Sequence, residues 1–238
     1  DGTQEPMDLH VDKIDPCIAV AEDGTKWLYL SGGWRKQLTP DGLDTVEGTL
    51  EHVYDGWIFP SDWVTEGLCL EGPKLKKIGD WWYYLSAEGG TAGPPTSHMV
   101  TVARSKTLDG PWENSPYNPL IHTWHDSDRW WSRGHGSLVD TPDGRWYCIY
   151  HSYENGFPGL GRQTLLEPVS FDSEGWPRSV VADVAAPIAA PLPLHPVDRK
   201  AHLGEFRVGL DWKYYKDFDP SRASIKDGVL TLKATGTC

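Results

Sequence analysis

The stretch EGPKLKKIGDWWYYLSAEGG, residues 71–90, starts with an acid beside Gly and Pro, continues as an apolar run, turns at Gly79-Asp80 and returns as an aromatic run. Two short strands around a tight turn with glycine are typical of a β-hairpin. The same order of features recurs in DPCIAVAEDGTKWLYLSGG, residues 15–33, and in GHGSLVDTPDGRWYCIYHSY, residues 134–153. The chain therefore carries one hairpin pattern three times.

This repeat aligns three polar residues, because Asp15, Glu71 and His135 each stand at the start of one hairpin, at intervals of roughly 60 residues. A unit of this size, with about four strands, predicts the blade of a β-propeller. The innermost strand of a blade runs along the central channel, so we expect the three side chains to converge on one pocket. The alternative is a β-sandwich with three similar hairpins, which would not also align the polar residues.

Composition narrows the class of ligand. The 238-residue chain has thirteen Trp, ten Tyr and five Phe, and its formal net charge is -12. This acidic balance does not suit a nucleic acid or an anionic membrane, and no apolar run reaches the roughly 20 residues of a membrane-spanning helix. A neutral, hydroxyl-rich ligand that stacks on flat rings suits the composition better.

The four cysteines, Cys17, Cys69, Cys148 and Cys238, lack the paired spacing of a zinc site. We expect the first three to be buried thiols in strands. Cys238, at the end of the sequence, is placed to pair with a group outside this chain.

The amino-acid composition changes at about Val184, where VAAPIAAPLPLHPVDR begins. Such an Ala- and Pro-rich segment predicts a linker, and alternating strands follow it. We therefore predict a partial propeller over residues 1–183, a linker over 184–200 and the first strands of a β-sandwich over 201–238. A piece this short cannot form a sandwich alone, so it is either cut short or completed by another chain.

Glu71 is the first candidate for catalysis. It lies among Leu68, Leu70 and Leu75, and apolar surroundings favour a neutral carboxyl group and raise its pKa. A carboxyl group that stays protonated near neutral pH can act as a general acid. With Asp15 as a second carboxylate, the predicted pocket holds the pair of carboxyl groups that a glycoside hydrolase needs.

Both acids also have plain structural interpretations. Glu71 can form a salt bridge with Lys74 or Lys76, and Asp15 before Pro16 can cap the start of a strand. Their equivalence within the repeat favours the functional interpretation.

A family resemblance rests on seven motifs in consecutive order, namely IDPCIAVAEDG, TEGLCLEGPKL, SAEGGT, SHMVTVARSKTLDGPWE, YNPLI, RGHGSLVDTPDG and LGRQTLLEPV. As an ordered set, from Ile14 to about Pro177, they resemble glycoside hydrolase family 43. The resemblance implies an all-β, five-bladed β-propeller, of which this chain has about three blades, with β-xylosidase or α-L-arabinofuranosidase activity. The part beyond the linker is similar to the start of the β-sandwich domain of many xylosidases.

The resemblance also implies an inverting mechanism with roles for particular residues. Glu71 of EGP takes the place of the general acid, and Asp15 of IDP that of the carboxylate that modulates its pKa and orients the sugar. Trp34 stands where xylosidases have an aromatic wall. Arg162 of GRQT matches an arginine that reaches the sugar hydroxyls and the acidic pair, and His98 of SHMV aligns with a histidine near the substrate subsite.

His135 of GHG stands where the family has an axial histidine, which binds either substrate or a water-coordinated calcium ion. The implied chemistry requires no cofactor, and a calcium ion at the propeller axis would be structural. From the residues alone, His135 can instead satisfy buried carbonyl groups, and Arg162 can belong to a structural ion pair.

The pattern departs from the family at the third acid. The family's general base lies about two blades upstream of the IDP aspartate, whereas only fourteen residues precede Asp15. Neither Asp1 nor Asp8 belongs to a matching motif. We therefore expect an N-terminal segment of another polypeptide to bring the first two blades and the base.

We predict an exo-type, inverting hydrolase of plant cell-wall hemicellulose, secreted or extracellular, that acts on xylo-oligosaccharides or arabinoxylan. It would release β-1,4-xylosyl or α-L-arabinofuranosyl residues, and the part that resembles a xylosidase sandwich favours xylose. The alternative is a non-catalytic propeller fragment that only binds sugar, through Trp34, Arg162 and the axial residues.

Overall fold

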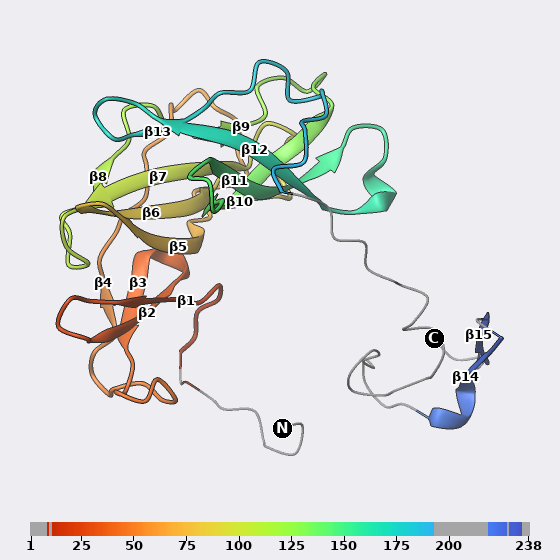
Figure 1. Cartoon of the computed structure of the whole chain (residues 1–238), viewed down its shortest axis with the longest axis horizontal. Helices are drawn as coiled ribbons and strands as arrows, with labels where there is room; N and C mark the ends of the chain where they lie inside the picture. Colours follow the sequence, from red (N-terminus) through yellow and green to blue (C-terminus); the bar gives the residue numbers. More distant parts are fainter. Residues whose placement is uncertain (1–8, 10, 193–218, 228, 235–238) are drawn as a thin grey trace. The chain divides into compact units, whose positions relative to one another are not determined.

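The computed structural model describes residues 9, 11–192, 219–227 and 229–234, and their regular structure is β-strand apart from three short 3₁₀ turns (Figure 1). Residues 8–189 form one compact unit, and the described residues after Ala189 belong to a second. Within the described residues, no helix is long and apolar enough to cross a membrane.

The first sheet is an antiparallel meander. Its strands, in both chain order and spatial order, are β1 (Cys17–Val20), β2 (Lys26–Leu30), β3 (Trp34–Gln37) and β4 (Glu51–His52). The predicted hairpin is confirmed, because β1 pairs with β2 across the turn at Asp23-Gly24. A 3₁₀ turn, η1 (Ser31–Gly33), joins β2 to β3.

The second sheet repeats the meander. Its strands are β5 (Glu71–Ile78), β6 (Trp81–Glu88), β7 (Met99–Ser105) and β8 (Glu113–Asn114), and β9 (Ile121–His122) pairs with the other part of β7. The register of β5 against β6 shifts between Glu71 and Lys74, where Pro73 stands. Proline is tolerated there because β5 is an edge strand and the ladder is already interrupted.

The third sheet consists of β10 (Trp130–Asp140), β11 (Trp146–Glu154), β12 (Gln163–Phe171) and β13 (Pro177–Ser179), with η2 (Pro158–Leu160) before β12. The predicted hairpin is present, but β10 starts before the predicted Gly134. The strand is bulged, since its register shifts on both sides of Gly134 and both Ser132 and His135 have positive φ, at 51° and 55°. Bulges re-aim side chains, and here they change the direction of the strand at His135.

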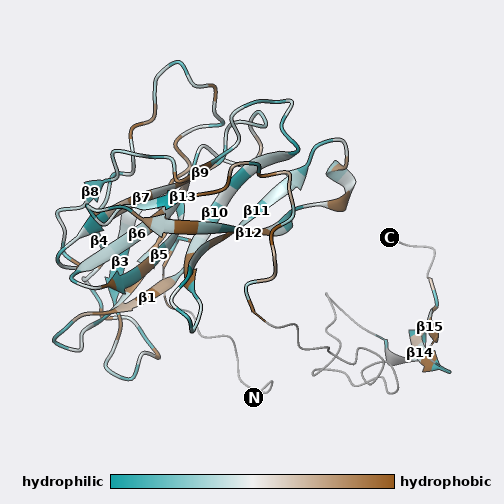
Figure 2. Cartoon of the chain, turned by 45° about the horizontal axis from the view of Figure 1, so that its top comes forward, coloured by the Kyte–Doolittle hydropathy of each residue, from teal (hydrophilic) through white to brown (hydrophobic). Residues whose placement is uncertain are grey.

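The three sheets lie side by side, with β1 against β5 and β10 against β6 and β7 (Figure 1). Aromatic side chains fill the space between the first two sheets, among them Tyr29, Tyr84 and Trp82. A second core lies between the last two sheets and includes Tyr83 and Trp176. Apolar and polar residues both occur along these strands (Figure 2). The faces of neighbouring sheets thus pack on one another, and the first strands of the three sheets, β1, β5 and β10, are adjacent. This is the arrangement of propeller blades.

The prediction of buried thiols in strands has a different outcome at each of the three described cysteines. Cys148 is a buried free thiol in β11, as expected, and Cys17 is a half-buried free thiol in β1. The prediction is wrong for Cys69, which is exposed in the loop before β5 and whose φ of 45° is not that of a strand. Cys238 lies outside the described residues.

The predicted linker and sandwich are described only in part. Residues 184–192 form no strand, and residues 193–218 lie outside the described residues. Beyond them, η3 (Pro220–Arg222) leads into an antiparallel hairpin of β14 (Ala223–Lys226) and β15 (Val229–Leu232). The sandwich itself stays a prediction.

Candidate active site

Asp15, Glu71 and His135 come from three different sheets and meet at one place. Glu71 is the first residue of β5, Asp15 lies just before β1, and His135 lies within β10. The backbone N–H of Gly72 donates to Oδ2 of Asp15 at 3.0 Å, and Nδ1 of His135 lies 4.0 Å from Oε1 of Glu71. The three residues that the repeat aligns are therefore neighbours in space.

Gly72 of the EGP motif permits this approach. Its φ is +59°, and a Cβ at this position would lie 2.6 Å from Nε2 of His135. A side chain would therefore both strain the backbone and displace the imidazole. The glycine lets the third sheet place His135 directly over the backbone that follows Glu71.

Glu71 has the electrostatic setting that its apolar neighbours predict. Its side chain is 28% exposed, and burial is the main reason why its pKa is raised above the ordinary value. The negative charges of Asp15 and Glu66 raise the pKa further, whereas the positive charge of Arg162 opposes the rise. A carboxyl group with a raised pKa holds its proton closer to neutral pH, as a general acid must.

The structural alternative for Glu71, a salt bridge to a neighbouring lysine, is not formed. Lys76 pairs with Asp140 at 2.6 Å, and the ammonium of Lys74 donates to the carbonyl of Pro73 at 3.2 Å. Both lysines therefore have other partners, and the carboxyl group of Glu71 faces His135 instead.

Trp34 follows a turn that is fastened to both acid-bearing segments. The N–H of Gly32 donates to the carbonyl of Leu70 at 2.7 Å, and the N–H of Ser31 donates to the carbonyl of Ile14 at 2.9 Å. Leu70 and Ile14 directly precede the two acids in the sequence. The half-buried indole ring thus starts β3 beside the segments that carry the carboxylates.

Arg162 lies between η2 and β12 and is exposed. Its positive charge opposes the rise in the pKa of Glu71 and contributes to lowering the pKa of His135 and His151. Arg162 forms no ion pair with another described residue, so the structural ion pair considered above is not seen in this part of the chain. Its guanidinium is free of such a partner at the edge of the site.

His98 lies behind the site. Its side chain is fully buried, and its ring stacks on that of His151, with centroids 5.2 Å apart and an interplanar angle of 18°. Burial lowers the pKa of His98 to about 3. The contact of His98 with substrate stays a prediction, and within the described residues the side chain has no exposed surface. His151, which the sequence analysis missed, pairs with Gly134 of the GHG motif.

Three imidazoles form a cluster behind Glu71. The ring nitrogens of His98, His135 and His151 that could bind a metal lie within 4.8 Å of one another. Burial is the main cause that lowers the pKa of each of them, so all three rings favour the neutral form. Neutral imidazoles suit zinc and related ions, whereas calcium takes oxygen ligands. This donor set does not fit a calcium ion bound directly by the three side chains.

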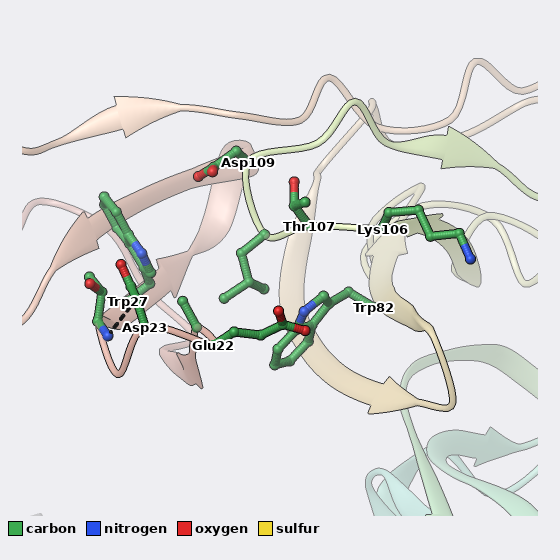
Figure 3. A pocket seen from close by; sticks show the side chains of 10 residues that line it. Glu22, Asp23, Trp27, Trp82, Lys106, Thr107 and Asp109 are labelled. Carbon is green, nitrogen blue, oxygen red and sulfur yellow. Dashed lines mark hydrogen bonds between the residues drawn. The ribbon is translucent and has the colours of Figure 1, made fainter.

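A hollow of about 320 Å³ lies at the other end of the strands, between the first and second sheets (Figure 3). Trp27 and Trp82 line it, together with Glu22 and Asp109. Both of these carboxylates already pair with basic side chains. Because Trp82 is near the start of β6, whereas Glu71 pairs with the end of that strand, the hollow is separate from the cluster of acids.

The general base has no assigned residue in the described part. Asp1 and Asp8 lie outside the described residues. Glu66, which the sequence analysis did not single out, is exposed, and its Oε2 accepts a hydrogen bond from the N–H of Ala92 at 2.7 Å. This bond holds the loop before β5 against the loop after β6.

Comparison with known proteins gives consistent matches. The model of glycosyl hydrolases family 43 matches residues 4–177. The chain is 33% identical over 234 residues to a xylan 1,3-beta-xylosidase of Vibrio sp., a match that covers 85% of this chain and 41% of that protein. It is 36% identical over 182 residues to the non-reducing end alpha-L-arabinofuranosidase BoGH43B of Bacteroides ovatus, covering 71% and 34% respectively. The chain spans less than half the length of these relatives.

Solved structures agree with this result. The GH43 protein BlXynB from Bacillus licheniformis has a TM-score of 0.74 and 30% sequence identity to the chain, over 93% of this chain and 43% of that chain. The structural relatives are five-bladed β-propellers, and the three sheets described above correspond to blades of that fold. The chain belongs to glycosyl hydrolase family 43.

Proposed function

We propose that the chain contributes the acid-bearing part of an exo-acting, inverting glycosidase that releases terminal pentose residues from plant cell-wall hemicellulose. The observation that carries this proposal is the partly buried Glu71, whose pKa is raised beside the second carboxylate of Asp15. The xylosidase and arabinofuranosidase relatives support the reaction class. We favour β-1,4-xylosyl over α-L-arabinofuranosyl residues, because the part beyond the linker resembles a xylosidase domain.

In the proposed reaction, protonated Glu71 donates its proton to the glycosidic oxygen. The bond from that oxygen to the anomeric carbon breaks as a water molecule attacks the opposite face of the sugar. Asp15 favours the protonated form of Glu71 through its negative charge. Arg162 and His135 bind sugar hydroxyl groups, and Trp34 stacks against the ring.

The attacking water needs a base, with about 6.5 to 9.5 Å between the acid and base carboxyl groups of an inverting enzyme. We propose that this base lies on two further blades, supplied by an N-terminal segment or a separate chain. Relatives of more than twice this length support the idea. The 238-residue chain assayed alone on an aryl β-xyloside should then show no turnover, and robust turnover by the monomeric chain would contradict the proposal.

Proton transfer and attack by water need no cofactor, so we propose none for catalysis. A calcium ion at the propeller axis would be structural and would contact His135 through a water molecule, because the imidazole cluster does not fit direct calcium binding. A chelator should then lower the thermal unfolding midpoint of the assembled enzyme and leave the mechanism unchanged. We place the reaction outside the cell, where polymeric hemicellulose occurs.

Glu71→Gln in the assembled enzyme tests the role of the acid. The variant should keep its affinity for xylo-oligosaccharides and lose their hydrolysis, with a smaller loss on aryl xylosides whose leaving group needs little protonation. Glu22→Gln, in the hollow at the other end of the strands, is the matched control. Hydrolysis by Glu71→Gln at the wild-type rate would exclude Glu71 as the acid.

Two further outcomes decide between the remaining alternatives. Sugar binding without hydrolysis by the wild-type assembly would favour the non-catalytic binding fragment. Product analysis with aryl β-xyloside and aryl α-L-arabinofuranoside would separate the two pentose specificities.

A further inference from the structure

A second aromatic site lies apart from the carboxylates. We name it the distal hollow, which has a volume of about 260 Å³ and is lined by Asp62, Trp63, Val64, Thr96, His122 and Trp124. Its residues come from three separate segments, namely the loop before β5, the loop before β7 and the end of β9 with the residues that follow. None of them belongs to the catalytic cluster described above.

The aromatic rings of the distal hollow pack against one another, and one of them, Trp124, is also exposed to solvent. Trp63 stacks on His122, with centroids 4.6 Å apart and an interplanar angle of 10°. Trp124 meets His122 edge to face at 4.8 Å and 82°. His122 is buried, whereas Trp124 is 58% exposed and also lines a neighbouring hollow of about 180 Å³. Of the tryptophans in the described residues, Trp124 is the one counted as exposed.

Hydrogen bonds hold the backbone that carries Trp124 in place. The carboxylate of Asp128 accepts from the N–H groups of both Trp124 and His125 at 3.1 Å, and the N–H of Asp128 donates to the carbonyl of His125 at 3.0 Å. Nε2 of His122 donates to the carbonyl of Thr96 at 2.7 Å. The indole itself packs edge to face against both His122 and Trp63, and a solvent-facing ring positioned in this way loses less conformational entropy when a ligand binds.

Strand pairing places the distal hollow at the same end of the blade as the catalytic acid. Glu71 of β5 pairs with Ala87 of β6, the next residue, Glu88, pairs with Met99 of β7, and Met99 pairs with His122 of β9. Three steps between neighbouring strands amount to roughly 14 Å from Glu71 to His122, and Trp124 follows His122 by two residues. A ligand that leaves the axial site across this end of the blade would therefore reach Trp124.

The chemistry of the lining indicates the class of ligand. No Lys or Arg lines the hollow, and its one ionisable carboxylate is that of Asp62. Such a lining suits neither an anion nor a nucleic acid. Aromatic faces next to a carboxylate and a threonine hydroxyl suit a neutral ring whose C–H face stacks and whose hydroxyl groups donate.

We propose that the distal hollow binds the leaving-group portion of the same polysaccharide whose terminal residue enters the axial site. A pentose unit several positions from the cleaved bond stacks on Trp124. The proposal rests on the proposed function for the identity of the sugar, but binding in the hollow can be measured without catalysis.

Calorimetric titration of the 238-residue chain with xylohexaose and xylobiose tests the proposal. Trp124→Ala should weaken xylohexaose binding about tenfold, as the loss of a central aromatic contact typically does, and should affect xylobiose less. Trp124→Phe, which keeps an aromatic face, should retain most of the affinity and guards against misfolding of the alanine variant. Leu43→Ala is the matched control, because Leu43 is 59% exposed but lies between β3 and β4 of the first sheet.

The outcomes separate this proposal from the proposed function. The proposal for the distal hollow would be overturned if the wild type did not bind xylohexaose. It would also be overturned if Trp124→Ala kept its affinity for xylohexaose, or lost affinity equally for xylohexaose and xylobiose. Binding that depends on Trp124, in an assembly that cleaves no glycoside, would uphold the hollow and refute the proposed hydrolysis. Cleavage of aryl xylosides with xylohexaose affinity unchanged in Trp124→Ala would do the reverse.

Discussion

Glu88 provides the sharpest prediction on stability. It is completely buried at the end of β6, and its Oε1 accepts hydrogen bonds from the N–H of Trp57 at 2.8 Å and the hydroxyl of Thr101 at 3.1 Å. Its Oε2 has no hydrogen-bond partner within the described part of the chain. Burial, the main cause, raises the pKa of Glu88 to about 7. Glu88→Gln keeps the accepting oxygen and removes the ionisation.

The direction and size of the effect follow from proton linkage. Because the pKa of Glu88 rises from an ordinary 4.5 to about 7 on folding, the folded state holds the proton more tightly. The stabilisation from the neutral carboxyl group is complete below pH 4.5 and is lost as the pH rises through about 7. At about 1.4 kcal/mol per pKa unit, the wild type loses roughly 3 kcal/mol across this range, whereas the glutamine variant does not.

Urea unfolding of the wild type and of Glu88→Gln at pH 5 and pH 8 measures this difference. The two proteins should be similarly stable at pH 5, and the variant should be the more stable by up to about 3 kcal/mol at pH 8. Contributions of the buried histidines cancel in the comparison. The same substitution at exposed Glu47 is the control. A variant that is less stable than the wild type at pH 8, or a difference independent of pH, would refute the reasoning.

Three further perturbations have defined outcomes. Asp15→Asn removes a charge that raises the pKa of Glu71, so the alkaline limb of the pH–rate profile of the assembled enzyme should move to lower pH. Arg133→Met leaves the buried carboxylate of Glu167 without its ion-pair partner, and the free energy of unfolding in urea should fall by about 3 to 5 kcal/mol. Gly33→Ala would place a Cβ 1.7 Å from a backbone oxygen, at a φ of +72°. Its thermal midpoint should drop by more than that of an alanine substitution at a glycine in an open turn.

The fold was largely predictable because its signals are local. Alternating strands and glycine turns identify hairpins from a few neighbouring residues, and repetition of the pattern aligned Asp15, Glu71 and His135, which the structure brings together. The pKa direction of Glu71 was predictable for the same reason, since its apolar neighbours are adjacent in the sequence.

Features that depend on distant contacts were not predictable. The bulges of β10 are shifts of its register against β11, and the polarity pattern around Ser132 does not reveal them. His98 resembled a substrate ligand by its motif, but packing against Gly134 buries it. The missed His151 reaches the site only through its cross-strand pair.

Two of the side chains that define the axial site stand on left-handed backbone, with φ of 59° at Asp15 and 55° at His135. Asn, Asp and Gly adopt this conformation most readily, whereas β-branched residues are strongly disfavoured there. Few residue types would therefore be tolerated at these two positions in a directed-evolution experiment on substrate range. Most variants of a saturation library would lose function because the new residue disfavours the backbone conformation, whatever the chemistry of its side chain. Neighbouring Trp34 has an extended backbone with φ of -93°, so it is the more productive position at which to diversify the pocket.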